Sequence, residues 1–495
     1  KYALIKITYN GHCCTLKENL IEYVKTLLNV NEAVIEDGII NLKVNNEIII
    51  EERDEEEWVY LYSFYNAENQ IAERITKLDK ARNVKKVSNI EKELKLIEER
   101  TDILLSEKQK EAIRAINDNN VTIITGGPGT GKTTIIKSII EIYKQKKYKI
   151  VLCAPTGRAA KRMSETTGEE ASTLHRLLEI GKVDEESLFK KNSEYKGAPI
   201  DGDIIIVDEV SMVDMFIMSY LLDCIYQGTK LILVGDSDQL PSVGPGSVLK
   251  DLIASEKIVT VHLDKIFRQA AKSKIIVNAH RVNNGKRFIN KEDPELEEDA
   301  NQDFFFIRET NQEKILKEVL SLCNGRLKNF GEYDFFENIQ VLTPTKKGLL
   351  GTKELNKALQ EALNPHRDGE AEKNSMGATF RIGDRVMQIK NNYDMYWEKL
   401  CDSGVETGNG IFNGETGIIT NINEKGKNLS VKFDDEKVCK YEFNDLEQIE
   451  HSYCMTIHKA QGSEFDVVIM IVPQAAPMLL TRNLLYTGLT RAKKL

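Results

Sequence analysis

The sequence contains no uninterrupted apolar segment long enough to cross a membrane. A membrane-spanning helix needs about 18 consecutive apolar residues, whereas the best apolar run, residues 467–480, is broken by Pro473, Gln474 and Pro477. The first residues also lack the apolar segment of a secretory signal. We therefore predict a protein that makes no contact with a membrane.

Cysteine pairs with the spacing of a metal site are absent as well. None of the eight cysteines belongs to a C-x-x-C pair, so the pattern does not predict a zinc site. Scattered thiols are typical of a reducing cytosol, and we expect a cytoplasmic protein of bacterial type.

An excess of basic residues is missing too. The chain has 68 Lys and Arg against 77 Asp and Glu, which gives a formal net charge of −9. Because nucleic acids are usually held by basic patches, the charge balance alone argues weakly against such a partner. The content of 41% hydrophobic and 29% charged residues is typical of globular proteins and excludes a disordered or collagen-like chain. The 495 residues are enough for about three or four domains.

The first 100 residues are predicted to form a small α/β domain. A helical apolar pattern covers residues 16–28, and strand-like runs follow at 33–35, 39–44 and 48–50. This order is similar to that of a winged helix, and a charged helical connector is predicted over residues 68–100. An aromatic stretch indicates either a base-stacking surface or, more commonly, core packing. Its members are Trp58, Tyr60, Tyr62, Phe64 and Tyr65.

Two larger α/β domains are predicted after residue 100. In residues 101–265, short β-branched runs alternate with helical segments, which predicts a parallel sheet covered on both faces. A second domain of this kind is predicted over residues 266–377 and 450–495. Between its two halves, residues 378–449 have the alternating pattern of a small inserted β-barrel. The expected strands are 121–125, 149–154, 203–207, 230–234 and 258–263 in the first domain, and 339–342 and 466–472 in the second.

A phosphate-binding loop is present at residues 126–133, which read Gly-Gly-Pro-Gly-Thr-Gly-Lys-Thr and match G-x-x-x-x-G-K-[ST]. The loop follows a predicted strand and opens a predicted helix, as the motif requires. Its glycines let backbone N–H groups wrap around phosphates, and the helix N-terminus adds its dipole. We expect Lys132 to neutralise the β- and γ-phosphates and the Thr133 hydroxyl to bind Mg²⁺.

Two carboxylates, Asp208 and Glu209, end the predicted buried strand 203–207. In a nucleotide site, the first lies near the metal ion and the second orients or deprotonates the attacking water. The alternative is a helix-capping Asp beside a solvated Glu, and the phosphate loop upstream disfavours it. The pair therefore predicts nucleotide hydrolysis.

Three further residues are expected at the same site. Gln239 follows strand 230–234, at the edge of the sheet where ligands bind in open α/β folds, and we expect it to report the presence of a γ-phosphate. Arg268 and Arg491 are expected to stabilise transition-state charge. Taken singly, either arginine is more often a surface or ion-paired residue.

The order of these segments resembles that of superfamily 1 helicases. Their residue sequences are most similar to the RecD-like branch, and within it to the long proteins that work alone. The segments that distinguish this branch are residues 172–178, 383–387 and 412–417. The resemblance covers residues 100–495. It implies two RecA-like motor domains, an SH3-like identity for the inserted barrel, and an ATP-dependent helicase that moves 5′→3′ along single-stranded DNA.

The resemblance also implies roles for individual residues. Gln109 reads adenine, and Arg268 and Arg491 are arginine fingers at an ATP site between the two motor domains. Gln461, Gly462 and Glu464 join the nucleotide state to the grip on DNA. The implied nucleotide-binding set is Gln109, Gly127, Pro128, Gly129, Thr130, Gly131, Lys132, Thr133, Thr134, Gln461, Gly462 and Glu464. The implied DNA contacts are Pro155, Thr156, Arg158, Thr173, His175, Thr343, Thr345, Asn413, Thr456 and His458.

Residues 185–200 lie where relatives carry a β-hairpin wedge that splits the duplex, and we expect a short wedge there. The chain begins with Lys1 rather than Met and stops directly after the Arg491 motif, so we expect a segment of a longer protein. The implied partners are single-stranded DNA and junctions of single strand and duplex, bound by a monomer. The sequence names no protein partner.

Four alternatives remain beside the lone helicase. The first is a single-strand translocase without strong unwinding, and the second is a helicase subunit of a recombination nuclease complex. The third is the helicase half of a conjugative relaxase, and the fourth is a DNA-binding scaffold with an inactive motor. The N-terminal extension and the lack of a nuclease motif favour the lone form. The presence of Lys132, Glu209, Arg268 and Arg491 disfavours an inactive motor.

Overall fold

The computed structural model describes residues 1–9, 11–82, 85–180, 197–265, 272–289, 302–401, 404–474 and 479–495. By their contacts, the residues fall into two compact units. The first unit comprises Lys1–Pro155, Ala160–Ser237 and Pro241–Lys265, and the second comprises Thr156–Ala159, Asp238–Leu240 and Ile266–Leu495. Among the residues described, no helix is both long enough and apolar enough to cross a membrane.

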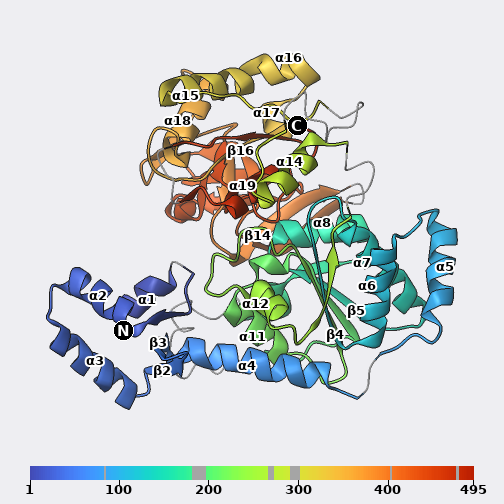
Figure 1. Ribbon diagram of the computed structural model, residues 1–495. Coiled ribbons are helices and arrows are strands. Elements are labelled where there is room, and N and C mark those ends of the chain that lie inside the picture. The colour runs from blue at the N-terminus through green and yellow to red at the C-terminus, as the bar shows by residue number, and fades with distance from the viewer. Residues whose placement is uncertain are drawn as a thin grey trace. The chain divides into compact units, whose positions relative to one another are not determined.

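The first unit begins with a small domain of three helices and a three-stranded sheet (blue in Figure 1). Its sheet has the order β1-β3-β2, with antiparallel pairing throughout. Tyr60 and Phe64 are buried in this region, as the packing interpretation of the aromatic stretch predicted. The elements are α1 (Tyr2–Thr8), β1 (Cys14–Leu16), α2 (Lys17–Leu28), α3 (Glu32–Val44), β2 (Ile48–Arg53) and β3 (Glu56–Leu61).

Helix α3 corrects the sequence prediction, which placed two strands at 33–35 and 39–44. The helix buries Ile35 and Ile39 on one face, while Ile40 and Val44 remain exposed on another. A helix that is apolar on two faces has no clear 3.6-residue pattern, so its sequence is indistinguishable from that of short buried strands.

A long helix joins the small domain to the first large sheet. This helix, α4 (Tyr62–Asp79), packs against α11 (Met215–Asp223). Phe64 meets the ring of Phe216 edge to face, with 4.9 Å between centroids, and Arg74 forms an ion pair of 2.5 Å with Asp223. The small domain and this side of the sheet therefore share one apolar core. The predicted helical connector is formed by α4 and α5 (Ile90–Thr101).

The first large sheet has six parallel strands in the order β6-β5-β7-β8-β4-β9. Helices pack on both of its faces, as Figure 1 shows. The strands are β4 (Val121–Gly126), β5 (Ile150–Ala154), β6 (Ala171–Thr173), β7 (Ile204–Val207), β8 (Lys230–Gly235) and β9 (Val259–Leu263). The five predicted strands are present, and the prediction missed β6, whose three residues are too short for a pattern. The covering helices include α6 (Glu107–Asp118), α7 (Lys132–Gln145), α8 (Gly157–Thr167) and α12 (Val248–Ala254).

The second unit contains a smaller parallel sheet with the strand order β20-β10-β21. Both predicted strands of this domain are present, and β20 is an addition. The strands are β10 (Ile339–Thr343), β20 (Cys454–Thr456) and β21 (Val467–Met470). The helices of this part include α14 (Lys274–Asn283), α15 (Gln312–Ser321), α17 (Phe335–Asn338), α18 (Thr352–Leu363) and α19 (Arg482–Leu489).

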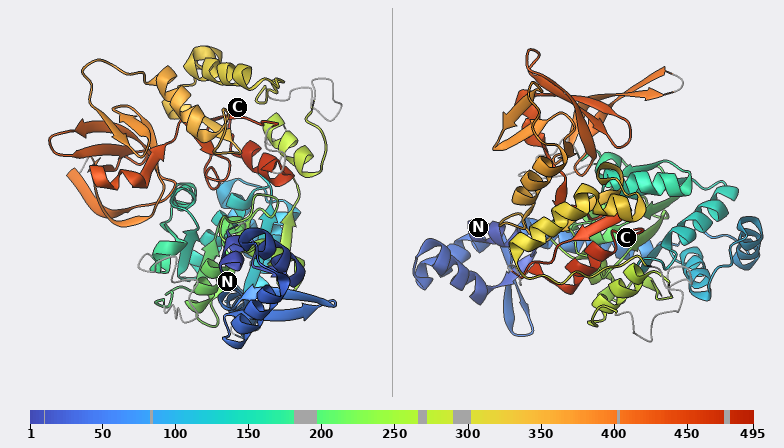
Figure 2. Two further views of the ribbon diagram at one scale, coloured as in Figure 1. Left: turned by 90° about the vertical axis from the view of Figure 1, so that its left-hand side faces the viewer. Right: turned by 90° about the horizontal axis from the view of Figure 1, so that it is seen from above.

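An antiparallel barrel is inserted between β10 and β20 (orange in Figure 2). Its seven strands have the order β15-β14-β18-β17-β16-β13-β19, and β14 and β15 pair along most of their length as a two-stranded ribbon. A separate hairpin of β11 (Glu372–Ser375) and β12 (Ala378–Arg381) precedes it. The barrel strands are β13 (Arg385–Gln388), β14 (Asn392–Cys401), β15 (Gly404–Ile411), β16 (Thr416–Asn423), β17 (Asn428–Phe433), β18 (Val438–Glu442) and β19 (Ile449–His451).

Asp384 joins this barrel to the parallel sheet of the second unit. The carboxylate is fully buried and accepts hydrogen bonds from Gln360 Nε2 at 2.7 Å and Asn364 Nδ2 at 2.8 Å, both on α18. The Tyr453 hydroxyl donates to it at 2.9 Å, and His451 Nε2 lies 3.0 Å away. The segment 383–387, which distinguished the RecD-like branch, is thus a structural joint.

Replacing Asp384 with alanine is expected to destabilise the second unit by about 3–5 kcal/mol, because it leaves several buried donors without an acceptor. Urea unfolding followed by the fluorescence of Trp397, in a Trp58→Phe background, measures the effect. Asp368→Ala removes an exposed carboxylate of the same unit and is expected to change stability by less than about 0.5 kcal/mol. Equal stability of the two variants would show that the joint is dispensable.

Candidate active site

The predicted phosphate loop connects β4 to α7 in the first unit. Gly129 and Gly131 have φ values of +73° and +83°, a conformation that glycine adopts without strain. A side chain at Gly126 would lie 2.7 Å from the Leu263 carbonyl oxygen, so this position also requires glycine. The Thr130 hydroxyl donates to the Gly127 carbonyl at 2.8 Å and stabilises the turn. Strand, loop and helix therefore have the arrangement that the motif predicted.

Lys132 is the first residue of α7, and its side chain folds back over the loop. Its ammonium group donates to the carbonyl oxygens of Gly126 and Gly127, the latter at 3.1 Å. The first N–H groups of α7 have no partner within their own helix, and the helix dipole places positive charge at this end. Loop, helix terminus and lysine together form a cradle suited to phosphates.

Asp208 and Glu209 directly follow the central strand β7. The backbone N–H of Asp208 donates to the Cys153 carbonyl at 3.0 Å, and the Asp208 carboxylate accepts the Glu209 N–H at 2.8 Å. Burial, together with the charge of Glu209, raises the pKa of Asp208 to about 6, while Lys132 opposes this shift. Two carboxylates and a lysine thus act on one another at this edge of the sheet.

The backbone of Glu209 is left-handed, with φ +54° and ψ +40°. This conformation is costly for a residue with a side chain, and such strain clusters at functional sites. It turns the chain sharply after β7 into a 3₁₀ helix, Val210–Met212. The neighbouring strand β8 ends at Gly235, where a side chain would lie 2.9 Å from Leu249 Cδ2 and 3.3 Å from the backbone nitrogens of Val210 and Ser211. The ends of β7 and β8 therefore pack closely.

Arg162 is a site residue that sequence reasoning missed. It lies on α8, and its guanidinium is 3.8 Å from the Glu209 carboxylate. The Glu209 side chain is 13% exposed, whereas that of Arg162 is 41% exposed. No motif marks Arg162; the available signal was its position one helical turn after Arg158, which places both on one face of α8.

Gln109, predicted to read adenine, lies beside the loop. Its Nε2 donates to the Gly131 carbonyl at 3.4 Å, while its Oε1 accepts the Ser106 N–H at 2.9 Å in a capping box at the start of α6. The side chain is 1% exposed. In this structure Gln109 therefore supports the phosphate loop.

Gln239 lies in the turn Asp238–Leu240, which belongs by its contacts to the second unit. Three side chains of that unit hold the backbone of this turn. Gln461 Nε2 donates to the Leu240 carbonyl, Asn483 Nδ2 donates to the Asp238 carbonyl, and the Thr487 hydroxyl accepts the Leu240 N–H, each at 2.8 Å. The structure thus places the predicted site residue Gln461 against the turn that contains Gln239.

Of the two predicted arginine fingers, the structure describes only Arg491. Arg268 lies outside the described residues, as do residues 185–196 of the predicted wedge. Arg491 is 2% exposed, and its guanidinium donates to the carbonyl oxygens of Thr487 and Ser463 and to the Thr490 hydroxyl. Nearby, Gly462 has φ +71°, and Glu464 lies 3.8 Å from Lys493.

Three of the threonines predicted to bind DNA cap the start of a helix or turn. Thr156 Oγ1 accepts the Ala159 N–H, Thr173 Oγ1 accepts the Arg176 N–H and Thr456 Oγ1 accepts the Lys459 N–H, at 3.2, 3.1 and 3.3 Å. Helix N-termini present free N–H groups to phosphates without reading sequence. This placement suits a DNA strand that is held by its phosphates.

Two other predicted DNA contacts are placed differently. Thr343 is fully buried, and its hydroxyl donates to the Leu350 carbonyl at 2.7 Å. In this structure the hydroxyl therefore has a partner inside the second unit rather than the predicted DNA contact. The Arg158 guanidinium donates to Ser463 Oγ at 2.9 Å and to Thr416 Oγ1, over the ring of Phe465. Burial lowers the pKa of Arg158 to about 10.

The remaining predicted contacts are at least partly exposed. Burial lowers the pKa of His175, and burial with the charge of Lys346 lowers the pKa of His458. Both shifts favour the neutral form of the histidine over the cation near pH 7. Asn413 is exposed in a barrel turn, and Pro155 and Thr345 are half-buried.

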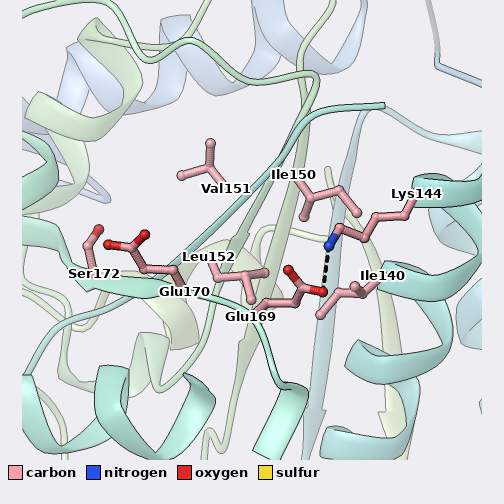
Figure 3. A pocket seen from close by; sticks show the side chains of 8 residues that line it. All are labelled: Ile140, Lys144, Ile150, Val151, Leu152, Glu169, Glu170 and Ser172. Atoms are coloured by element: carbon pink, nitrogen blue, oxygen red, sulfur yellow. Dashed lines mark ion pairs between the residues drawn. The ribbon is translucent and has the colours of Figure 1, made fainter. Parts of the chain in front are cut away.

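A pocket of about 290 Å³ lies elsewhere on the first sheet (Figure 3). Lys144 and Glu169 form an ion pair of 2.5 Å in its wall. Its lining comes from α7, β5 and the segment around β6, and shares no residue with the phosphate loop. The pocket is therefore distinct from the candidate active site. Its lining residues are Ile140, Lys144, Ile150, Val151, Leu152, Glu169, Glu170 and Ser172.

Three family models match separate parts of the chain. They describe an AAA domain over residues 109–245, the SH3 domain of ATP-dependent RecD-like DNA helicases over 355–433, and a UvrD-like helicase C-terminal domain over 451–495. With the parallel sheets, these matches confirm the predicted RecA-like core and the SH3-like identity of the barrel.

Several known proteins are similar to this chain. An ATP-dependent RecD2 DNA helicase of Deinococcus radiodurans is 35% identical over 395 residues, which cover 79% of this chain and 48% of the relative. This chain therefore spans about half the length of that relative. The RecD subunit of the RecBCD enzyme of Buchnera aphidicola is 29% identical over 88% of this chain and 78% of its own length. A solved Pif1 helicase from Bacteroides, in complex with ADP-AlF3 and ssDNA, aligns with a TM-score of 0.43 and 19% identity over 79% of this chain and 91% of that one.

Proposed function

Since the chain belongs to the RecD-like family of superfamily 1 helicases, we propose that it is an ATP-driven DNA helicase that moves 5′→3′ along single-stranded DNA and unwinds duplex ahead of it. The observation that carries the proposal is the edge of the first sheet. There the phosphate loop with Lys132 follows β4, and Asp208 and Glu209, the latter with a left-handed backbone, follow β7. Binding alone does not require a second carboxylate, whereas hydrolysis does.

The predicted site residues have the following roles in the proposal. Lys132 leaves the loop carbonyls and binds the β- and γ-phosphates of ATP, with the N–H groups of the loop and of α7 around them. Glu209 orients the attacking water and accepts its proton. Gln239 senses the γ-phosphate, and Arg268 and Arg491 stabilise the charge that develops on it.

The residues at the loop also fit a magnesium ion. Thr133 contributes a hydroxyl and Asp208 a carboxylate, and Mg²⁺ prefers such hard oxygen ligands. A bound Mg²⁺ neutralises part of the phosphate charge. Asp208 is half-buried and lies within electrostatic reach of Lys132, which suits a carboxylate that is neutralised by a cation.

Coupling of hydrolysis to movement is proposed to pass through the network around Gln239. Gln461 contacts the turn of Gln239 through Leu240, and in the proposal Gly462 and Glu464 carry the change to the DNA-holding residues. Thr156, Thr173 and Thr456 begin helices or turns whose N–H groups bind phosphates, so the grip is independent of base sequence. We take the working unit to be a monomer on single-stranded DNA.

An unwinding assay with two substrates tests this function. We expect ATP- and Mg²⁺-dependent separation of a duplex with a 5′ single-stranded overhang, and none with a 3′ overhang of the same sequence. ATPase activity stimulated by single-stranded DNA is measured in parallel. ATPase activity without separation of either substrate would favour the translocase alternative, and separation only from the 3′ overhang would overturn the assignment.

A further inference from the structure

Helix α3 of the small N-terminal domain has a second apolar face that no part of the described chain covers. Its inner face is buried through Ile35 and Ile39, whereas Val34, Ile40 and Val44 are 57%, 57% and 75% exposed. A helix with apolar residues on opposite faces is typical of one that is covered on both sides. We call Val34, Ile40 and Val44, together with Glu36 and Asp37, the α3 outer face.

The position of α3 in its domain is that of a recognition helix. It follows α2 after the short turn at residues 29–31, and the hairpin of β2 and β3 comes next. In DNA-binding domains with a helix-turn-helix, the second helix enters the major groove. The order of elements by itself therefore suggests a duplex-binding surface.

The charge of this region excludes that use. Residues 32–57, which include α3, β2 and the turn into β3, contain ten acidic and two basic residues, so this stretch carries −8 of the net −9 of the whole chain. With 100° between successive residues, Glu36 and Asp37 lie on either side of the stripe of Ile40 and Val44. DNA presents a dense row of negative phosphates, which this surface repels.

We propose that the α3 outer face binds a basic amphipathic helix of a partner protein. The apolar side of such a helix covers Ile40 and Val44, and its Lys or Arg side chains meet Glu36 and Asp37. Helix-in-groove recognition of this kind takes its affinity from apolar anchors, and charge complementarity selects the partner and raises the association rate. This inference is independent of the ATPase assignment, because it uses no residue of the nucleotide site.

Binding of a labelled amphipathic peptide of leucine and lysine to the full chain, followed by fluorescence anisotropy, tests the proposal. The double variant Ile40→Ser/Val44→Ser is expected to weaken binding about tenfold or more, because it removes the apolar anchors. Val405→Ser, at a valine of β15 that is 61% exposed, is the matched control and is expected to bind as the unchanged chain does. Circular dichroism and ATPase activity verify that both variants are folded.

A second pair of measurements addresses charge and competing occupants. The variant Glu36→Lys/Asp37→Lys is expected to bind the lysine peptide more weakly and a peptide of leucine and glutamate more tightly. Lysine-peptide affinity that is equal in all variants would overturn the proposal. It would also be overturned if Ile40→Ser/Val44→Ser weakened binding to blunt duplex DNA, or if sedimentation showed a dimer of the chain that this variant dissociates.

Discussion

Replacing Lys132 with alanine is expected to lower the kcat of DNA-stimulated ATP hydrolysis by about 100- to 1,000-fold, because a preorganised positive group at a phosphoryl-transfer site contributes this much. Lys132 is the charged residue of the loop, and its charge acts on Asp208. Its removal is also expected to weaken ATP binding, since in the proposed function the ammonium group contacts the phosphates before and during the reaction. Steady-state ATPase assays with saturating single-stranded DNA measure the change.

The matched control for this variant is Lys137→Ala, on the same helix α7. Lys137 is exposed and about one helical turn beyond the loop, so its replacement is expected to leave kcat unchanged. A Lys132→Ala protein that turns over ATP at the rate of the Lys137→Ala protein would refute the nucleotide site. Thermal unfolding of both variants checks that the loop change acts on catalysis and not on folding.

Replacing Glu209 with glutamine is expected to lower kcat by about 100- to 10,000-fold while leaving ATP affinity intact, because glutamine orients water but accepts no proton. The change keeps the size of the side chain at a position whose backbone is left-handed. Binding of a fluorescent ATP analogue, measured beside the ATPase rate, separates the two properties. Lys132→Ala lowers both, whereas Glu209→Gln lowers only turnover.

Glu256→Gln provides the control for Glu209→Gln. Glu256 is an exposed residue of the same unit and also has a left-handed backbone, with φ +53°, so the same substitution is made in the same conformation away from the site. We expect normal turnover from it. Full activity of Glu209→Gln, or loss of ATP binding in it, would remove Glu209 from the role of general base.

The acidic net charge has a local origin. The formal net charge of −9 argued weakly against a nucleic-acid partner, yet residues 32–57 alone carry a charge of −8. The remaining residues are close to neutral, and nothing in their balance opposes DNA binding. The sign of the net charge is therefore set by one acidic stretch of the small domain and carries no information about the partner of the two larger domains.

Much of the nucleotide site could be predicted from the sequence because its chemistry is local. The phosphate loop is one continuous segment between a strand and a helix, and Asp208 and Glu209 end a strand that is apolar throughout. In a parallel sheet all such strand ends meet at one edge. The segments at residues 126–133 and 208–209 therefore lie together in any sheet that contains both strands in this order.

Other features depended on neighbours that are distant in the sequence. Arg162 reaches Glu209 only because α8 returns along the sheet, and Asp384 gathers donors from α18, β19 and Tyr453. Thr343 was predicted to hold DNA, but the fold buries its hydroxyl against Leu350. Such contacts have no sequence pattern, since they follow from the packing of whole elements.

The sequence by itself determined the motor: its phosphate loop, its carboxylate pair, its parallel strands and its inserted barrel. Only the tertiary structure decided the state of α3, because a run that is apolar on two faces is equally compatible with strands and with a helix. The choice was made by the core of the small domain, which buries Ile35 and Ile39 and leaves Ile40 and Val44 outside. The same two-faced pattern that misled the prediction is the physical basis for a docking surface.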